Sequence, residues 1–258
     1  MCLIAFAWQV HPRWRLVLAG NRDEFHARPS AVLARWSDLA IVGGRDLEAG
    51  GTWLGVTEAG RCCVVTNVRD PRDPQLGASR GLLATDYLAG AADATAHAQQ
   101  MLAPAAGYRP FNLLTFDAQA AFYLGNRPEP RAQAVAPGVH GLSNADFNTP
   151  WPKTRALMAR LAAWIEAGGA GDFAPLFAAL ADERQAPDAE LPDTGIGLER
   201  ERWLSSAFIR GERYGTRAST VVAIGHDGRG AIVERRFGPE GHFLGESRLP
   251  FGPLTAMD

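Results

Sequence analysis

Residues 2–8 read CLIAFAW, and residues 14–19 read WRLVLA. Apolar side chains occupy both alternating faces of these segments, which is typical of strands covered on both sides. Residues 62–65, CCVV, have the same character. Short turns around Pro12 and Gly60 join these segments, and such turns favour hairpins because parallel strands need long crossover connections. We therefore expect an antiparallel sheet that lies between two covering layers.

Two later segments, Arg80–Ala103 and Thr154–Ala167, carry the apolar stripe of an amphipathic helix, and Phe173–Leu180 predicts a shorter helix. Further strands are expected at Phe111–Phe116, Ala121–Leu124, Ser219–Ile224, Ala231–Arg236 and His242–Ser247. No repeat, low-complexity tract or clear linker divides the chain. The succession of strands, helices and strands predicts a single domain over residues 1–258.

The composition is that of a soluble globular protein with a full core, since 47% of the 258 residues are hydrophobic and 21% are charged. Lys153 is the only lysine, and the 28 acidic residues outnumber the 26 basic ones. This balance argues against a nucleic-acid partner held by counter-ion release. The apolar segment near the start is far shorter than the roughly 20 residues that span a bilayer, and it lacks the pattern of a secretory leader. We expect a cytoplasmic protein without a transmembrane segment.

The three cysteines are Cys2, Cys62 and Cys63. Their odd number and the absence of a CxxC pair argue against a disulfide framework or a metal site, and the six histidines show no ligand spacing. We expect no metal and no cofactor. Cys62 and Cys63 are adjacent in a strand, so they should pack on its opposite faces.

Cys2 is different because of its position. Met1 is normally removed when a small residue follows it, and its removal would give Cys2 a free α-amine beside its thiol. Such an amine has a pKa near 7.7 to 8.0 in small peptides, so it can accept the thiol proton at physiological pH. The alternative is a small hydrophobic residue that opens a buried strand.

The tetrad Asn21-Arg22-Asp23-Glu24 follows a buried strand directly. A hairpin would bring these polar residues close to Cys2. A carboxylate there could hold the N-terminal amine, and an arginine could bind a substrate carboxylate or stabilise the thiolate. The alternative is a solvated turn with a surface ion pair.

Several motifs together strongly resemble the NRDE family, which takes its name from the tetrad and includes the transport and Golgi organisation protein 2 group. The matching segments are Met1–Ile4, Gly20–Pro29, Gly51–Val56, Leu191–Gly195, Leu204–Ile209 and Tyr214–Thr220. The activities suggested for this family concern haem handling, lipid or acyl-CoA metabolism and organisation of the secretory pathway.

The chain also resembles, more distantly, the N-terminal nucleophile hydrolases of the choloylglycine hydrolase, penicillin acylase and isopenicillin acyltransferase type. This resemblance implies an α+β fold: a four-layer αββα sandwich of two mainly antiparallel sheets covered by helices. It also implies a mature N-terminal cysteine that acts as the nucleophile.

The same resemblance assigns roles to particular residues. Cys2 matches the nucleophile, and Asp23, in the Asn-x-Asp turn, matches the residue beside it that holds the α-amine. Asn67 matches the donor to the oxyanion, and Asn144 and Arg217 match residues that hold the α-amine and the substrate. The alternative for both asparagines is ordinary turn chemistry at strand ends.

Two departures from the hydrolase pattern concern the tetrad. The arginine that precedes the Asn-x-Asp turn in the hydrolases is Gly20 here, which leaves open whether Arg22 takes its role. The spacing is also one residue short, so the register stays open. Arg22 and Trp53 are the candidate substrate-binding residues, and His26 is a further residue to test.

Two functions stay open at this stage. The first is an amidohydrolase or acyltransferase that acts on a small amide or thioester after removal of Met1. The second is a binding or carrier protein for haem or an acyl-CoA or lipid-like ligand, without turnover. The sequence indicates neither the substrate nor the oligomeric state.

Overall fold

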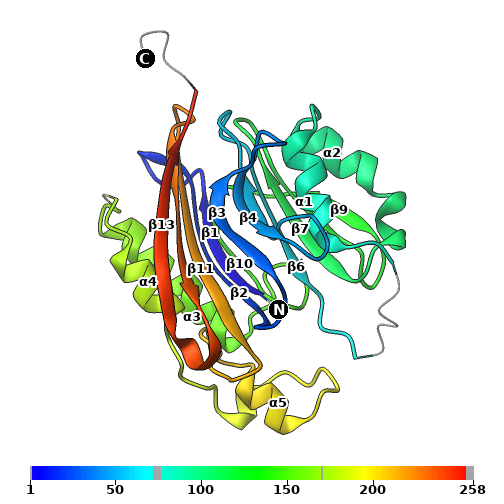
Figure 1. Cartoon of the computed structure of the whole chain (residues 1–258), viewed down its shortest axis with the longest axis vertical. Coiled ribbons are helices and arrows are strands. Elements are labelled where there is room, and N and C mark those ends of the chain that lie inside the picture. The colour runs from blue at the N-terminus through cyan, green and yellow to red at the C-terminus, as the bar shows by residue number, and fades with distance from the viewer. Residues whose placement is uncertain (1, 72–76, 170, 254–258) are drawn as a thin grey trace.

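Two antiparallel sheets stack face to face, and helices cover their outer faces (Figure 1). A computed structural model describes residues 2–71, 77–169 and 171–253. The first sheet has the strand order β10-β1-β2-β11-β12-β13, and the second has the order β3-β4-β5-β6-β7-β8-β9. The arrangement confirms the expected αββα sandwich.

The strands of the first sheet are β1 (Cys2–Trp8), β2 (Trp14–Phe25), β10 (Gly138–Leu142), β11 (Tyr214–Gly225), β12 (Gly230–Phe237) and β13 (Phe243–Phe251). Those of the second are β3 (Ser30–Arg35), β4 (Val42–Asp46), β5 (Leu54–Val56), β6 (Cys62–Asn67), β7 (Phe111–Phe116), β8 (Ala121–Gly125) and β9 (Arg131–Ala134).

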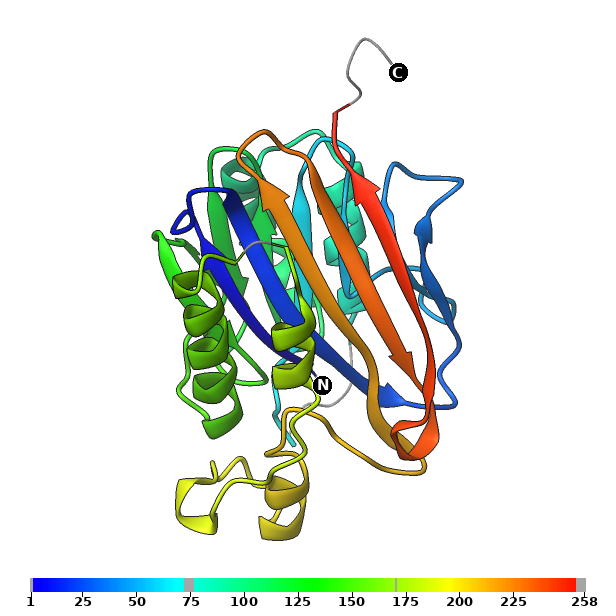
Figure 2. The same ribbon diagram turned by 90° about the vertical axis from the view of Figure 1, so that its left-hand side faces the viewer.

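The first sheet is covered by α3 (Pro152–Glu166) and α4 (Ala174–Leu180), which lie across β1 and β2 (Figure 2). The second sheet is covered by α1 (Arg80–Ala89) and α2 (Ala94–Met101). The short α5 (Leu198–Trp203) lies below the sheets in the view of Figure 1, at the end of the sandwich where β1 begins. Three 3₁₀ turns complete the fold at Pro104–Gly107, Asp188–Glu190 and Pro239–Gly241.

The apolar character of β1 on both faces follows from its place in the fold. Ile4, Phe6 and Trp8 belong to the core between the two sheets. The alternating residues, Leu3 and Ala5 among them, pack against the residues of α3 and α4. The two neighbouring cysteines of β6 divide in the same way: Cys62 packs in the core between the sheets and Cys63 under α1, as the alternation predicts.

The expected helix Arg80–Ala103 is wrong as a single element. The structure has two helices there, since α1 ends at Ala89 and Gly90 adopts an extended backbone. The side chain of Asp93 then accepts a hydrogen bond from Ala96 N at 2.7 Å and caps the start of α2.

Five strands and one helix were not predicted. They are β3, β4, β5, β9, β10 and α5. These elements are three to six residues long, and several are rich in glycine or partly exposed, so their periodicity is too weak to read from the sequence. No helix in the described part of the chain is long and apolar enough to cross a membrane.

Hydrogen bonds between side chains and the backbone join the two sheets at the start of β1. Ser143, which follows β10, donates through Oγ to the Cys2 carbonyl at 3.0 Å. The Thr66 hydroxyl on β6 donates to the Ser143 carbonyl at 2.9 Å and accepts from Asn112 Nδ2 at 3.1 Å. These buried contacts fix the first residue of β1 relative to the end of β6.

Close backbone packing next to this region generates a stability prediction. A Cβ atom at Gly51 would lie 2.3 Å from the carbonyl carbon of Gly81, at the start of α1. Gly51→Ala should therefore lower the free energy of unfolding by roughly 1 to 3 kcal/mol, because neither backbone can move freely. Urea denaturation measures the change.

Gly107→Ala is the matched control, since no atom lies within 4 Å of a Cβ at that position. It should change the free energy of unfolding by less than about 0.5 kcal/mol. Equal effects of the two substitutions would contradict the close approach of Gly51 to Gly81.

Candidate active site

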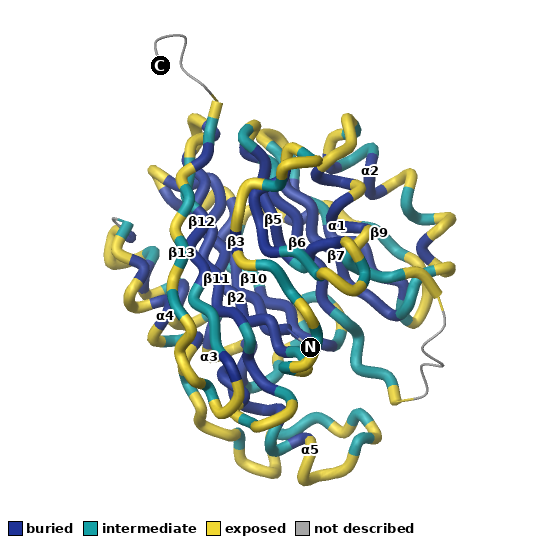
Figure 3. Tube along the Cα trace, viewed as in Figure 1, coloured by how far each residue is buried: buried dark blue, intermediate teal, exposed yellow. Residues whose placement is uncertain are grey.

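A cavity of about 390 Å³ opens where β1 begins, between the ends of the two sheets. Its size is at the lower end of the range for small-molecule sites. The sequence-predicted residues on its wall are Cys2, Arg22, Asp23, Trp53 and Asn67. The strands β1, β2 and β6 are buried along most of their length, whereas the segment before α5, residues 181–197, is largely exposed (Figure 3).

Cys2 is the first residue of β1 and pairs with Arg22 of β2. Its side chain points to the same face of the sheet as that of Ile4, towards the space between the sheets, and is 9% exposed. Burial raises the pKa of the Cys2 thiol, and the nearby Asp23 carboxylate adds to the increase. The thiol is therefore protonated at neutral pH, so nucleophilic attack by this sulfur needs a base.

Asp23 is 1% exposed and lies on the opposite face of β2 from Arg22. The Thr216 hydroxyl donates to Asp23 Oδ1 at 2.7 Å, and the Tyr214 hydroxyl donates to the Asp23 carbonyl at 3.2 Å. Burial raises the pKa of the Asp23 carboxyl, while Lys153 and Thr216 lower it. These contacts fix the carboxyl group at the edge of the cavity.

Asn67 ends β6 on the cavity wall, and Asn144 holds its backbone. Asn144 Nδ2 donates to the Asn67 carbonyl at 2.9 Å, and the Asn144 carbonyl accepts from Arg69 N at 2.7 Å. Asn144 is not among the described residues that line the cavity. The structure thus brings the two asparagines together but places only Asn67 at the cavity.

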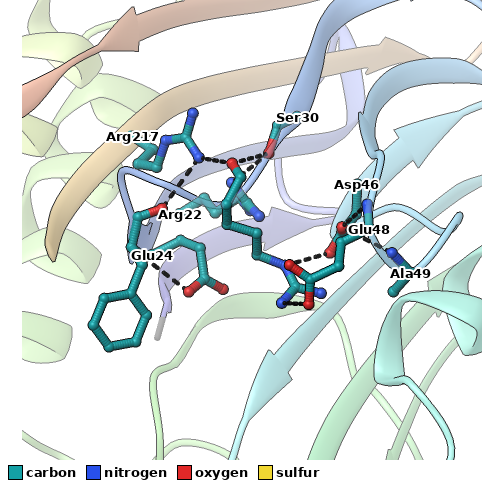
Figure 4. A network of polar contacts seen from close by, with 9 residues as sticks. Arg22, Glu24, Ser30, Asp46, Glu48, Ala49 and Arg217 are labelled. Atoms are coloured by element: carbon teal, nitrogen blue, oxygen red, sulfur yellow. Dashed lines mark hydrogen bonds and ion pairs between the residues drawn. The ribbon is translucent and has the colours of Figure 1, made fainter. Parts of the chain in front are cut away.

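Arg217 does not reach the cavity lining of the described residues. It lies at the irregularity in β11 between Thr216 and Ala218, and its guanidinium donates to the carbonyl groups of Phe25 and Arg28. It therefore supports the turn after β2 (Figure 4). Contact between Arg217 and a substrate stays a prediction.

Arg22 and Trp53 line the cavity together. The guanidinium carbon of Arg22 lies 4.3 Å from the centre of the Trp53 ring, and Arg22 Nη1 donates to Ser30 Oγ at 3.2 Å. Stacking on an indole ring is favourable for a guanidinium group. His26, by contrast, contacts the Gly211 carbonyl at 3.2 Å and is not among the described residues of the cavity lining.

Comparison with known proteins places the chain in a family. The model of the Transport and Golgi organisation 2 family matches residues 1–239. The chain belongs to this family. The Transport and Golgi organization protein 2 homologues of Bos taurus and Homo sapiens are 35% and 34% identical to it, and each match covers 91% of this chain and 92% of the relative.

One solved structure has a fold similar to that of the present chain. A mutant of the conjugated bile acid hydrolase from Clostridium perfringens superposes with a TM-score of 0.50 over the whole of both chains, at 8% identity. At this identity the likeness shows the fold alone, the αββα sandwich.

Sequence reasoning missed a group of buried charged residues beside Asp23. Lys153 in the first turn of α3 is 5% exposed and donates through Nζ to the Leu204 carbonyl at 2.8 Å. Arg69 and Glu201 form an ion pair that is also buried. The solitary lysine in an arginine-rich chain was a signal that could have been followed, whereas Arg69 and Glu201 lie in segments without a motif.

Burial lowers the pKa of Lys153 to about 8, and the Asp23 carboxylate opposes this decrease. The described residues contain no group of three or more His, Cys, Asp or Glu side chains that could hold a metal ion. The cavity wall presents the Cys2 thiol, carboxyl groups, the Asn67 amide and four guanidinium groups, those of Arg22, Arg28, Arg80 and Arg109.

The single lysine allows a direct test of this environment. In protein labelled with ¹³C-lysine, one side-chain Cε resonance should titrate with a midpoint near 8 instead of the usual 10.5. Asp23→Asn should lower the midpoint further, because it removes a negative charge that favours the ammonium form. Asp38→Asn, in an exposed ion pair with Arg45, should leave it unchanged. A midpoint near 10.5, or no response to Asp23→Asn, would contradict the burial of Lys153 beside Asp23.

Proposed function

We propose that this protein, after removal of Met1, is an N-terminal cysteine nucleophile enzyme that hydrolyses or transfers the acyl group of a small amide or thioester. One observation carries the proposal: the thiol of the second residue lies on the wall of the cavity with the buried Asp23 next to it in the fold. The proposal treats residues 1–258 as one domain, located in the cytoplasm and acting without a cofactor.

The first step requires deprotonation of the thiol. Because burial raises the pKa of Cys2, a nearby base is needed, and we assign this role to the free α-amine of Cys2. Asp23 would hold this amine, while the Thr216 hydroxyl keeps the carboxylate in place at 2.7 Å. Lys153 helps Asp23 to hold the amine, because its positive charge lowers the pKa of Asp23 and favours the carboxylate form.

The sulfur of Cys2 would then attack the carbonyl carbon and form a C–S bond. Asn67, together with a backbone amide, would donate to the developing oxyanion, and each such donor contributes roughly 2.7 to 4 kcal/mol. Asn144 has a positioning role in this scheme, because its side chain holds the Asn67 backbone.

The α-ammonium would next protonate the departing amine or thiolate as the C–N or C–S bond of the substrate breaks. Water, or an acceptor nucleophile, would release the acyl group from Cys2. Both steps use the same thiol and amine, so the mechanism depends on a free N-terminus at Cys2.

Mass spectrometry and a substrate panel test this proposal together. The purified protein should begin at Cys2 with an unmodified α-amine. Turnover of at least one compound in a panel of small amides and thioesters should fall by about 10³-fold or more in Cys2→Ser, because the weaker nucleophile has no comparable route. Activity should increase with pH up to about 8, as the α-amine becomes neutral.

Cys62→Ala is the matched control, since Cys62 is fully buried in the core between the sheets and should retain turnover. A retained Met1 or an acetylated Cys2 would contradict the amine-assisted mechanism. Binding of haem or an acyl-CoA that persists in Cys2→Ser, with no turnover of the panel, would favour the alternative of a binding or carrier protein.

A further inference from the structure

Arg22 is a buried cation without a paired anion. It is 7% exposed, and its side-chain contacts are the Trp53 ring and the Ser30 hydroxyl. No carboxylate of the described residues forms an ion pair with it. A guanidinium group that is largely buried is normally paired with a carboxylate or phosphate, so this arrangement is unusual.

Two nitrogens of the Arg22 guanidinium, Nε and Nη2, form the edge of the group that makes no hydrogen bond within the described residues. Nη1 donates to Ser30 Oγ, whereas Nε and Nη2 have no hydrogen-bond partner among the described residues. Neither nitrogen is sealed from solvent, and the residue lines the cavity. The N–H groups of Nε and Nη2 are parallel and lie in one plane, which matches the two oxygens of a carboxylate.

The acidic residues near Arg22 are engaged elsewhere. Glu24 lies on the same wall and accepts from Phe25 N at 2.9 Å, and Asp46 pairs with Arg28 at 2.8 Å (Figure 4). Glu234 is buried and accepts from Leu33 N at 3.1 Å; burial raises the pKa of its carboxyl, while this hydrogen bond and the charges of Arg236 and Arg22 lower it. None of these carboxyl groups forms a hydrogen bond or an ion pair with Arg22.

Arg22 also has a fixed relation to the thiol. It is the register partner of Cys2 in the antiparallel β1–β2 pair. Directly opposite residues in such a pair have Cα atoms roughly 4.5 to 5.5 Å apart and side chains on the same face. An anion bound to Arg22 would therefore lie in the same cavity as the Cys2 thiol, on the same face of the sheet.

We propose that Arg22 binds a carboxylate that the substrate carries close to the carbonyl group attacked by Cys2. Trp53 holds the guanidinium plane in place, and Nε and Nη2 provide the two donors. The substrate class is thereby narrowed to amides or thioesters with a neighbouring carboxylate. This choice of substrate class rests on the proposed function. Binding of an anion by Arg22 does not depend on turnover.

Alkylation of Cys2 by two small reagents tests the site without a known substrate. Iodoacetate carries a carboxylate next to its reactive carbon, and iodoacetamide carries a neutral amide there. In both reactions the thiolate sulfur forms a bond to the methylene carbon, and iodide leaves with the electron pair. The ratio of the two rates, measured at one pH, cancels differences in the thiolate fraction.

The iodoacetate to iodoacetamide ratio for Cys2 should exceed that of a free Cys-Leu-Ile-Ala peptide by about tenfold or more, as expected for charge-assisted hydrogen bonds. Arg22→Met should return the ratio to the peptide value. Arg22→Lys should give an intermediate ratio, because a lysine keeps the charge but lacks the two parallel donors. Arg184→Met, which removes an exposed arginine paired with Asp182, should keep the wild-type ratio.

A wild-type ratio equal to that of the peptide would overturn the proposal, as would full retention of the ratio in Arg22→Lys or Arg22→Met. If Arg22→Met does not fold, butyrate supplies a second measurement on the wild-type protein: it should slow alkylation by iodoacetamide, and butanol should not. No protection by butyrate would count against the carboxylate site.

The two proposals can fail separately. A high alkylation ratio in a protein that keeps Met1 would support the anion site and contradict the amine-assisted enzyme. A free Cys2 with turnover of neutral amides, together with a ratio equal to the peptide value, would support the enzyme and contradict the anion site.

Discussion

The register between β1 and β2 is the constraint on which the candidate site depends. It places Cys2 opposite Arg22, so that the thiol and the guanidinium share the face towards the cavity. A slip of one residue would move Leu3 to that face and turn Cys2 towards the helices. Asn21 opposes such a slip, because its side chain donates to the carbonyl groups of Leu180 and Ala207 at 2.8 Å and accepts from Ser219 at 2.6 Å.

Charges around the thiol are buried in pairs, with one exception. Arg69 pairs with Glu201, and the charges of Lys153 and Asp23 stabilise each other. These groups come from β2, α3, α5 and the loop after β6, so the cluster also joins the layers at one end of the sandwich. Arg22 is also buried, but it has no ion pair with a carboxylate among the described residues and lines the cavity instead. This contrast distinguishes a structural cluster from a binding group, and it is the basis for assigning a carboxylate to the substrate.

The sequence predicted the long, fully buried elements and the part of the site next to them. The apolar alternation of β1 and β2 is strong, and the hairpin it implies brings Asp23 and Arg22 to Cys2 as expected. Short strands such as β5 and the break at Gly90 depend on tertiary contacts and capping, which leave a weak pattern. The sequence pattern also did not show where the Arg217 side chain lies. An irregularity in β11 turns this side chain towards backbone carbonyl groups, to which it donates hydrogen bonds. Lys153 acquires its importance only when α3 packs beside Asp23.

Trapping of an acyl group tests the central claim, that the thiol of an N-terminal Cys2 is the nucleophile. The protein would be mixed with p-nitrophenyl acetate, quenched in acid, digested and mapped by mass spectrometry. The account predicts one acetyl group on the peptide that begins with Cys2, and none on this peptide in Cys2→Ser. A peptide that begins with Met1, or an acetyl group found only on other residues, would contradict it.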